Sequence, residues 1–472
     1  MKNYDPYKKT ILFFASLVNI LLMTLVFAWV WYGYYSGTMY QSIQFYRRGN
    51  YVLLALYALL LFFFSNMYGG LKIGQLRRIE VLLSQYLSLF LTNVVAYMII
   101  CLLAFRPVNP LRLCIALLVE IVISSLWIIV TIYFYNRIFQ PWKILLIYGE
   151  RPAADLVYKV EARRDKYAIY DAINVEEGIE AIAEKMKDFQ AVIIGDISAI
   201  KRNDILKYCY AHKVRAYVIP KLSDIILMGA DRIHVFDTPF LLSKGYTLSF
   251  DQRFWKRTMD LFIAVILLIL ASPFMLLTAI VIKLYDRGPV FYKQVRCTRY
   301  EKEFEIYKFR SMIVNAESDG VAKLAEENDC RITPIGKFIR ATRIDELPQL
   351  LNIIKGDMSF VGPRPERPEI MKEYCEDMPE FKFRTRVKAG LTGFAQVYGK
   401  YNTTPYDKLK LDLFYIENYS LWMDIKLILM TVKTVLKKDA TEGITQGQTT
   451  ALKENTEEEE SVEQIVQEMI KK

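Results

Sequence analysis

The chain has 472 residues, of which 53% are hydrophobic, and its formal net charge is +10. Together with a mean hydropathy of +0.17, this composition excludes a single soluble domain and indicates a membrane protein. The lysines and arginines are scattered and no basic run alternates with aromatic residues, so we expect no nucleic-acid partner. Anionic lipid head groups and nucleotide phosphates fit the charge better.

Histidine and cysteine are scarce in a chain of this length. There are two histidines, and the six cysteines are far apart without a C-x-x-C pair. This distribution excludes a disulfide framework and a zinc site, and it fits a reducing, cytoplasmic setting. Chemistry based on a histidine has equally few candidates. Any catalysis must therefore depend on carboxylates.

Four apolar segments near the N-terminus are long enough to cross a bilayer as helices. They cover approximately residues 11–32, 51–68, 81–105 and 113–135, so we expect a four-helix transmembrane domain over residues 1–140. Basic residues before the first segment and in the second loop favour a cytoplasmic N-terminus. Glu120 lies inside the fourth segment near one end, where it either has a function or simply reaches water.

Residues 141–249 alternate short β-branched runs with helical stretches, which predicts a Rossmann-like domain with a parallel sheet. After its first strand, Arg151 occupies the position where a dinucleotide-binding turn needs a glycine to approach a pyrophosphate. Asp171 is the corresponding candidate for a ribose-binding acid, but it lacks the glycine turn before it. This degenerate fingerprint favours a structural or regulatory module over dinucleotide binding.

A fifth apolar run, residues 261–284, has basic residues on both flanks, and such residues prefer the cytoplasmic side. Ser272 and Pro273 lie at its centre. Proline removes a backbone donor and clashes with the carbonyl four residues earlier, while a serine hydroxyl can cover a freed carbonyl. We therefore expect a re-entrant membrane helix over residues 259–285. A kinked helix that spans the membrane is the alternative.

The last third contains side chains suited to binding a pyrophosphate, with arginine as a bidentate donor and lysine as a point charge. These candidates are Lys293, Gln294, Arg296, Lys308, Arg310, Arg340 and Arg364. Asp345 and Glu346 lie among them. Asp345 has a structural explanation as a helix N-cap, with Glu346 complementing the helix dipole. A catalytic explanation of Asp345 is also available. Arg364 lies between two prolines that restrict its backbone, and phosphoryl transfer depends on rigidly placed arginines.

Further motifs follow one another in this region. They are Lys256-Arg257 with Asp260, Ser272-Pro273, residues 288–296, 308–312, 345–350, 356–359, 362–366 and 390–393, and Asp424. From about residue 254 to 437 the chain resembles the bacterial sugar transferase family, the monotopic polyprenyl-phosphate glycosyl-1-phosphate transferases. The whole chain resembles its large members, which carry a four-helix membrane domain and a Rossmann-like insert. Ala389 and Arg287 depart from the usual pattern, both at loop positions.

The resemblance implies a mostly helical catalytic domain over residues 250–438 and a two-step reaction. Asp345 would attack a UDP-sugar, UMP would leave, and undecaprenyl phosphate would then take the sugar phosphate from Asp345. Glu346 would hold Mg²⁺, while Lys308, Arg340 and Arg364 would neutralise phosphate charge. We expect a multi-pass protein of the bacterial inner membrane, with its catalytic domain on the cytoplasmic face, and a homo-oligomer such as a dimer.

Two other functions remain as alternatives. One is a membrane-tethered, NAD-dependent sugar-nucleotide oxidoreductase or epimerase centred on the middle domain. Arg151 argues against it, because it replaces a glycine that the dinucleotide-binding turn needs. The other is an inactive scaffold for polysaccharide assembly, against which the intact Asp345-Glu346 pair counts. The acidic, polar tail over residues 439–472 is assigned no chemistry.

Overall fold

The computed structural model describes residues 7–39, 47–149, 154–161, 163–244, 247–314, 331–399, 403–435 and 466. The chain forms two compact units, Met1–Ile219 with Glu457–Lys472, and Pro220–Thr456. The second unit, which contains the expected catalytic domain and is called the catalytic unit below, begins at Pro220. Five helices in the described residues are long and apolar enough to cross a membrane.

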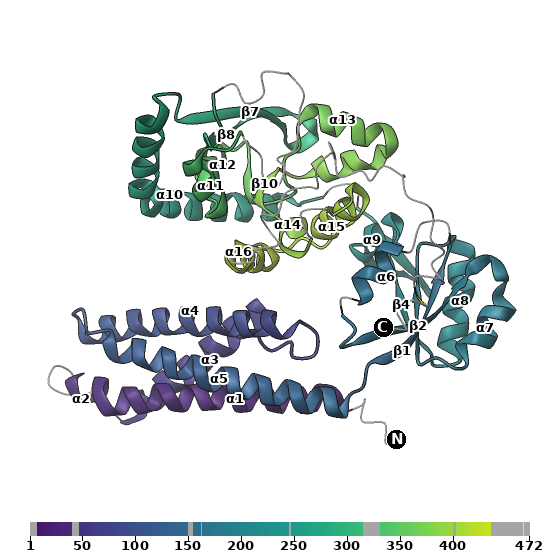
Figure 1. Cartoon of the computed structure of the whole chain (residues 1–472), viewed down its shortest axis with the longest axis horizontal. Helices are drawn as coiled ribbons and strands as arrows, with labels where there is room; N and C mark the ends of the chain where they lie inside the picture. The colour runs from purple at the N-terminus through teal and green to yellow at the C-terminus, as the bar shows by residue number, and fades with distance from the viewer. Residues whose placement is uncertain are drawn as a thin grey trace. The chain divides into compact units, whose positions relative to one another are not determined.

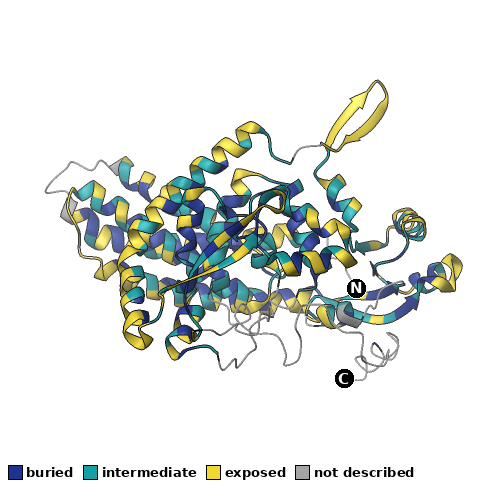
Figure 2. Cartoon of the chain, turned by 90° about the horizontal axis from the view of Figure 1, so that it is seen from above, coloured by how far each residue is buried: buried dark blue, intermediate teal, exposed yellow. Residues whose placement is uncertain are grey.

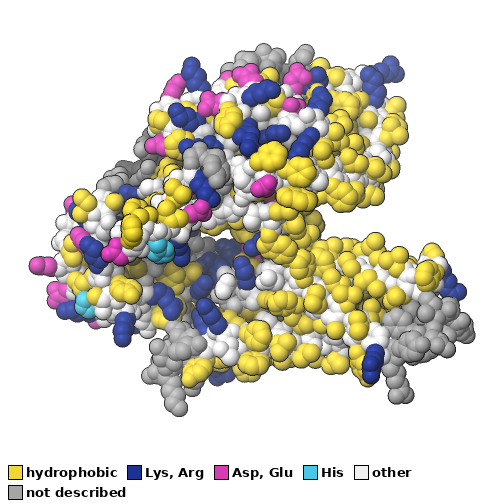
Figure 3. Space-filling view, turned by 180° about the vertical axis from the view of Figure 1, so that it is seen from behind, with side chains coloured by type: hydrophobic (Ala, Val, Ile, Leu, Met, Phe, Trp, Pro, Cys, Tyr) yellow, Lys and Arg dark blue, Asp and Glu magenta, His cyan; other side chains and the backbone are white. Residues whose placement is uncertain are grey.

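Four of these helices coincide with the apolar segments near the N-terminus. They are α1 (Lys8–Val30), which continues through a π-helical turn (Trp31–Tyr35) into α2 (Ser36–Met39), then α3 (Arg47–Tyr68), α4 (Arg78–Ala104) and α5 (Leu111–Ile138). The face of these helices visible in Figure 3 is almost entirely hydrophobic. A helix satisfies its own backbone hydrogen bonds, which is what a segment in lipid requires.

The interior of the four-helix domain contains a buried carboxylate. Glu120 is 0% exposed, and it accepts hydrogen bonds from Tyr57 Oη and Asn93 Nδ2, both at 2.7 Å. The ring of Phe27 stacks on Tyr57 with the centroids 4.1 Å apart. Of the two expectations for Glu120, the one in which it simply reaches water is therefore wrong, because the packing of three helices encloses it.

The α/β domain has a four-stranded parallel sheet in the order β2-β1-β3-β4. Its elements are β1 (Trp142–Tyr148), α6 (Ala154–Glu161), β2 (Tyr167–Asn174), α7 (Ile179–Met186), β3 (Ala191–Ile194), α8 (Ala199–Ala211) and β4 (Arg215–Val218). This confirms the parallel α/β prediction. Arg151 lies outside the described residues, and Asp171 forms an exposed ion pair with Lys185 at 3.2 Å.

The second unit begins with α9 (Leu222–Met228) and an antiparallel hairpin of β5 (Asp231–Val235) and β6 (Thr238–Leu242), all of whose strand residues are exposed (Figure 2). The elements that follow are α10 (Phe250–Asp286), β7 (Phe291–Cys297), β8 (Glu303–Phe309), α11 (Pro334–Ala341), the 3₁₀ turn η5 (Ile344–Glu346), α12 (Gln349–Lys355), β9 (Ser359–Val361), α13 (Pro368–Asp377), the 3₁₀ helix η6 (Pro379–Arg386), β10 (Gly390–Thr392), α14 (Phe394–Tyr398), α15 (Pro405–Glu417) and α16 (Leu421–Val435). This unit is mostly helical, as expected.

Helix α10 continues through Pro273 but changes direction, and Figure 1 shows it as two arms. Pro273 cannot donate to the carbonyl of Ile269, and the hydroxyl of Ser272 donates to that oxygen at 2.8 Å instead. The serine thus covers the freed carbonyl, as the sequence predicted. Side chains around this bend, such as those of Leu270 and Phe274, are exposed.

Both arms of α10 are attached to the same folded unit. In the first arm, Lys256 Nζ forms a buried ion pair with Asp424 at 2.7 Å, and Asp260 accepts from the backbone nitrogen of Phe360 at 2.9 Å. In the second arm, Ile282 packs in a buried cluster with Phe309. The apolar centre of the helix is therefore exposed while its two ends are fixed.

Candidate active site

The two adjacent carboxylates lie in a short turn between α11 and α12. Arg343 has a left-handed backbone, with φ of 57°, and this residue directs the chain out of α11 into η5. Asp345 is the middle residue of that 3₁₀ turn, whereas α12 begins at Gln349 and its N-cap residue is Pro348. The N-cap explanation of Asp345 is therefore wrong. A left-handed arginine before the acid moves the helix start past it.

Asp345 is buried but only partly bonded. It is 9% exposed, and within the described part of the chain its Oδ1 atom has no hydrogen-bond partner. Burial raises the pKa of Asp345, and the negative charge of Glu346 raises it further, while Lys308, Arg343 and Arg340 oppose both effects. Asp345 therefore has a desolvated oxygen to which no group in the described residues donates a hydrogen bond.

Glu346 is held very differently. Its Oε1 atom lies 3.1 Å from Arg364, 3.3 Å from Arg343 and 3.6 Å from Lys308. Burial would raise the pKa of Glu346, but the charges of these three residues outweigh it and hold the pKa well below its usual range. Glu346 therefore stays ionised and gathers three cations beside Asp345.

The cations come from separate elements. Lys308 is in β8, which pairs along its length with β7, and Arg364 follows β9. Burial lowers the pKa of Lys308, against the opposing charge of Glu346. Arg340 lies in the last turn of α11, from where its charge lowers the pKa of Asp345. The structure thus brings together three of the predicted basic residues, Lys308, Arg340 and Arg364, around Asp345 and Glu346. Arg343, which the sequence analysis did not single out, is a further cation beside Glu346.

Arg364 is supported by a buried network that the sequence analysis missed. Arg384 Nη2 donates to the backbone oxygen of Arg364 at 3.0 Å and lies 2.8 Å from Asp412 Oδ2. Its Nη1 lies 3.2 Å from Glu366, which also pairs with Lys408. Burial would raise the pKa of Glu366, but Lys408 and Arg384 hold it well below its usual range. This network fixes the loop that presents Arg364.

The remaining predicted residues lie on or beside the β7–β8 hairpin. Arg296 donates to Gln294 Oε1 at 2.6 Å and to the oxygen of Pro365 at 3.2 Å, and burial lowers the pKa of Arg296 to about 10. Lys293 instead pairs with Glu305 at 2.9 Å near the surface. Arg310 is buried in an ion pair with Asp286 at the end of α10. Arg296 and Gln294 thus border the Arg364 loop, while Lys293 and Arg310 have other partners.

The carboxylate pair fits a magnesium ion that protein and substrate hold together. No group of three or more histidine, cysteine, aspartate or glutamate side chains within the described ranges could bind a metal alone. Mg²⁺ commonly uses one or two carboxylates and completes its shell with water and substrate phosphates. The unpartnered Oδ1 of Asp345, next to the ionised Glu346, is the type of oxygen ligand that this cation takes.

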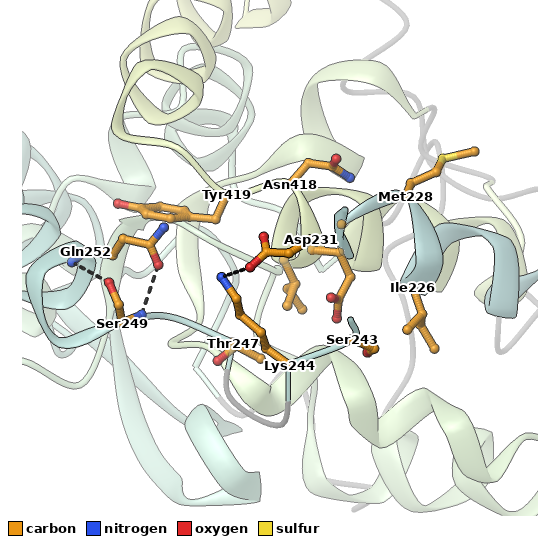
Figure 4. Close-up of a pocket in the computed structure, with 13 residues that line it drawn as sticks. Ile226, Met228, Asp231, Ser243, Lys244, Thr247, Ser249, Gln252, Asn418 and Tyr419 are labelled. Atoms are coloured by element: carbon orange, nitrogen blue, oxygen red, sulfur yellow. Dashed lines mark hydrogen bonds and ion pairs between the residues drawn. The ribbon is translucent and has the colours of Figure 1, made fainter. Parts of the chain in front are cut away.

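A separate cavity of about 390 Å³ lies between the β5–β6 hairpin, the start of α10 and the end of α15 (Figure 4). Its polar lining is largely paired: Lys244 lies 2.6 Å from Asp231, and Ser249 and Gln252 cap the start of α10. Neither Asp345 nor Glu346 lines it. This cavity is therefore not the site of the carboxylate pair.

Comparison with known proteins supports the same region. The family model for bacterial sugar transferases matches residues 251–438. The chain is 31% identical over 379 residues to a UDP-N-acetylgalactosamine-undecaprenyl-phosphate N-acetylgalactosaminephosphotransferase of Aeromonas hydrophila, covering 76% of this chain and 87% of that protein. It is 37% identical to an undecaprenyl-phosphate galactose phosphotransferase of Salmonella typhimurium, over 47% of this chain and 49% of that protein.

A UDP-glucose:undecaprenyl-phosphate glucose-1-phosphate transferase of Escherichia coli is 38% identical over 209 residues, which is 43% of each chain. The matches to the Salmonella and Escherichia proteins thus cover about half of each, whereas the Aeromonas match extends over most of both chains. With the carboxylate pair and its cations inside the matched region, this chain belongs to the bacterial sugar transferase family.

Proposed function

We propose that this enzyme transfers a sugar-1-phosphate from a UDP-sugar to undecaprenyl phosphate, giving undecaprenyl-diphosphate-sugar and UMP. The observation that carries the proposal is the unequal pair: a buried Asp345 with an unpartnered oxygen, next to a Glu346 that holds three cations. Such a site combines a nucleophile with preorganised positive charge, which is what phosphoryl transfer requires. The names of the relatives supply the substrate class.

In the first step, an oxygen of Asp345 attacks the sugar-side phosphorus of the donor. The bond from that phosphorus to the bridging oxygen breaks, and UMP leaves with the electron pair. In the second step, a phosphate oxygen of the lipid attacks the same phosphorus and the bond to Asp345 breaks, restoring the carboxylate. No proton transfer is needed in either step, which agrees with the absence of histidine from the site as described.

The other residues bind and neutralise. Arg364 and Lys308 have room to exchange part of their interaction with Glu346 for phosphate oxygens, since Arg364 has five donors and Lys308 three. Arg340 adds charge near Asp345. Mg²⁺ held by Glu346, with Asp345 beside it, would supply further neutralisation of the pyrophosphate.

We further propose that α10 is re-entrant and that the catalytic unit lies on the cytoplasmic face of the bacterial inner membrane. A straight 37-residue helix is about 55 Å long at 1.5 Å per residue, so its ends would lie on opposite sides of a bilayer. Here both ends are fixed to one folded unit by the Lys256–Asp424 and Arg310–Asp286 pairs. In a chain without native cysteines, single cysteines at Asp251 and Arg296 should be labelled from the same membrane face.

The expected homo-oligomer also remains a proposal. The β5–β6 hairpin is its best candidate surface because its apolar residues are exposed, with Phe236 at the turn 97% exposed. The mass of the detergent-solubilised protein tests this. Phe236→Ser should give monomers if the hairpin joins two copies, and an unchanged mass would refute the role of the hairpin.

The reaction itself is tested without the lipid acceptor. Incubation with Mg²⁺ and a panel of UDP-glucose, UDP-galactose and UDP-N-acetylgalactosamine should release one UMP per active site with the correct donor. Mass spectrometry should then find a sugar phosphate on Asp345, and Asp345→Asn should give neither burst nor adduct. An adduct elsewhere, or UMP release that requires both substrates, would overturn the two-step mechanism. No turnover with lipid present would favour the scaffold.

A further inference from the structure

The sheet of the α/β domain has two faces that are covered unequally. Alternate strand residues point to opposite faces. On the first face, Leu145, Ile147, Val192 and Ile194 form a buried cluster with residues of both α7 and α8. Figure 1 shows these two helices together on one side of the strands. Two helices are a normal cover for half of a doubly wound sheet.

The second face has less helix over it. Ile144, Leu146, Ala191 and Ile193 point to this side and are buried. Of the described helices in this domain, only the eight-residue α6 contributes to their cluster, and α6 follows β1 and precedes β2. Among the strands, α6 packs mainly against β2, at one edge of the sheet, so we infer that the surface over β3 and β4 needs another partner on this side.

That partner comes from the far end of the chain. Val466 is helical, 2% exposed, and belongs to the same buried cluster as Ile144, Leu146, Ala191 and Ile193. Residues 457–472 also belong to the same compact unit as the α/β domain, whereas residues 220–456 form the other unit. A valine of the acidic tail thus completes a core more than 270 residues earlier in the sequence.

The sequence around this valine predicts an amphipathic helix. Ser461 and Gln464 have the spacing of a capping box. Apolar residues recur at positions 462, 465, 466, 469 and 470, which lie on one face of a helix. Residues 457–460 are glutamates and residues 471 and 472 are lysines, so both ends complement a helix dipole. Gln467 falls on the polar face of the same pattern.

We propose that the C-terminal segment is a docking helix whose binding surface is the second face of the α/β sheet. Val466 supports this placement because it is buried in the cluster on that face of the sheet. Because the catalytic unit lies between Ile219 and Glu457 in the sequence, docking connects both of its ends to the first unit. The Rossmann-like domain thereby acts as a receptor for the tail of its own chain, and release of the tail exposes an apolar sheet face.

Hydrogen exchange of the full-length protein in detergent micelles tests this proposal. Val466→Lys places a charge in the buried cluster, whereas the matched control Gln467→Lys adds the same charge to the polar face. Val466→Lys should accelerate exchange in β3 and in peptides from residues 461–472 by at least about tenfold, through local release of the segment. Gln467→Lys should leave both protected, and α8 on the opposite face should stay protected in both variants.

Equal exchange in Val466→Lys and the control would overturn the proposal. If Val466→Lys also accelerates exchange in α8, the substitution has destabilised the whole α/β domain. A truncated chain that ends at Thr456 is then used as the test protein in place of this variant. Adding a peptide of residues 457–472 to that chain should then restore the protection of β3, and failure to do so would overturn the proposal as well. A lysine cross-linker applied to a mixture of ¹⁴N-labelled and ¹⁵N-labelled protein shows which chain the tail binds. Cross-links from the lysines at positions 471 and 472 to the α/β domain should join peptides with the same isotope if the tail docks in its own chain. Such cross-links between peptides with different isotopes would contradict the proposal.

Discussion

Two buried glutamates, one in each unit, are stabilised in opposite ways. Glu346 in the catalytic unit has three cationic side chains around one oxygen. Glu120 in the four-helix domain has hydrogen bonds from Tyr57 and Asn93, which are neutral groups. A buried ionised carboxylate is costly unless it is paired, whereas a protonated one needs only hydrogen bonds. The surroundings of Glu346 therefore stabilise an ionised carboxylate. The surroundings of Glu120 can accommodate a carboxyl group without a charge.

Of the tests that compare the two glutamates, removing the charge of Glu346 should have the largest effect. Glu346→Gln leaves Arg364, Arg343 and Lys308 without the carboxylate that collects them, so transfer should fall by roughly a hundredfold to a thousandfold. Steady-state turnover with donor and lipid measures it. Raised Mg²⁺ should restore part of the activity if cation affinity is the defect. Activity near that of the wild type would show that the three cations are positioned without Glu346.

The pH dependence of stability sharpens the same contrast. The pKa of Glu346 is lower in the folded chain than in the unfolded one, so its ion pairs stabilise the fold above the unfolded value of about 4.3. That stability begins to decrease below this value and is lost fully only as the pH falls through the lower pKa of the folded state. The Tm of the wild type should therefore decrease from pH 5 to pH 3 more than the Tm of Glu346→Gln. Parallel Tm curves for the two proteins would contradict this origin of the stability.

Arg340 should have a smaller effect, on the pH dependence of catalysis. Its charge lowers the pKa of Asp345, which burial and Glu346 raise. Asp345 must be ionised to attack, so Arg340→Ala should move the acidic limb of the rate profile to higher pH and reduce the maximal rate by about tenfold. Lys293→Ala, which removes the partner of Glu305, is the control and should leave the limb in place. An unmoved limb in Arg340→Ala would exclude this coupling.

Local sequence signals predicted the elements better than the contacts between them. Hydropathy and the alternation of strands and helices located the long apolar helices near the N-terminus and the parallel sheet, because these patterns depend on residues close in sequence. The N-cap explanation of Asp345 failed since a left-handed Arg343 shifts the helix start. Arg384 and Asp412 were missed because their ion pair forms only when η6 and α15 pack together. Their acidic partner Glu366, in contrast, lay in a recognised motif.

Glu120→Gln tests the other half of the comparison and should have the smallest effect. A glutamine keeps the shape of a protonated glutamate, and its amide can donate to Asn93 Oδ1, which has no hydrogen-bond partner within the described residues. Loss of one neutral hydrogen bond costs about 1 kcal/mol, so the Tm should fall by only a few degrees and turnover should be almost unchanged. Glu120→Leu removes the acceptor of Tyr57 Oη and one of the acceptors of Asn93 Nδ2, which also donates to Leu89 O, so this variant should be clearly less stable. If Glu120→Gln is instead as unstable as Glu120→Leu, the four-helix domain requires a charge at this position, and the two glutamates are held by the same principle after all.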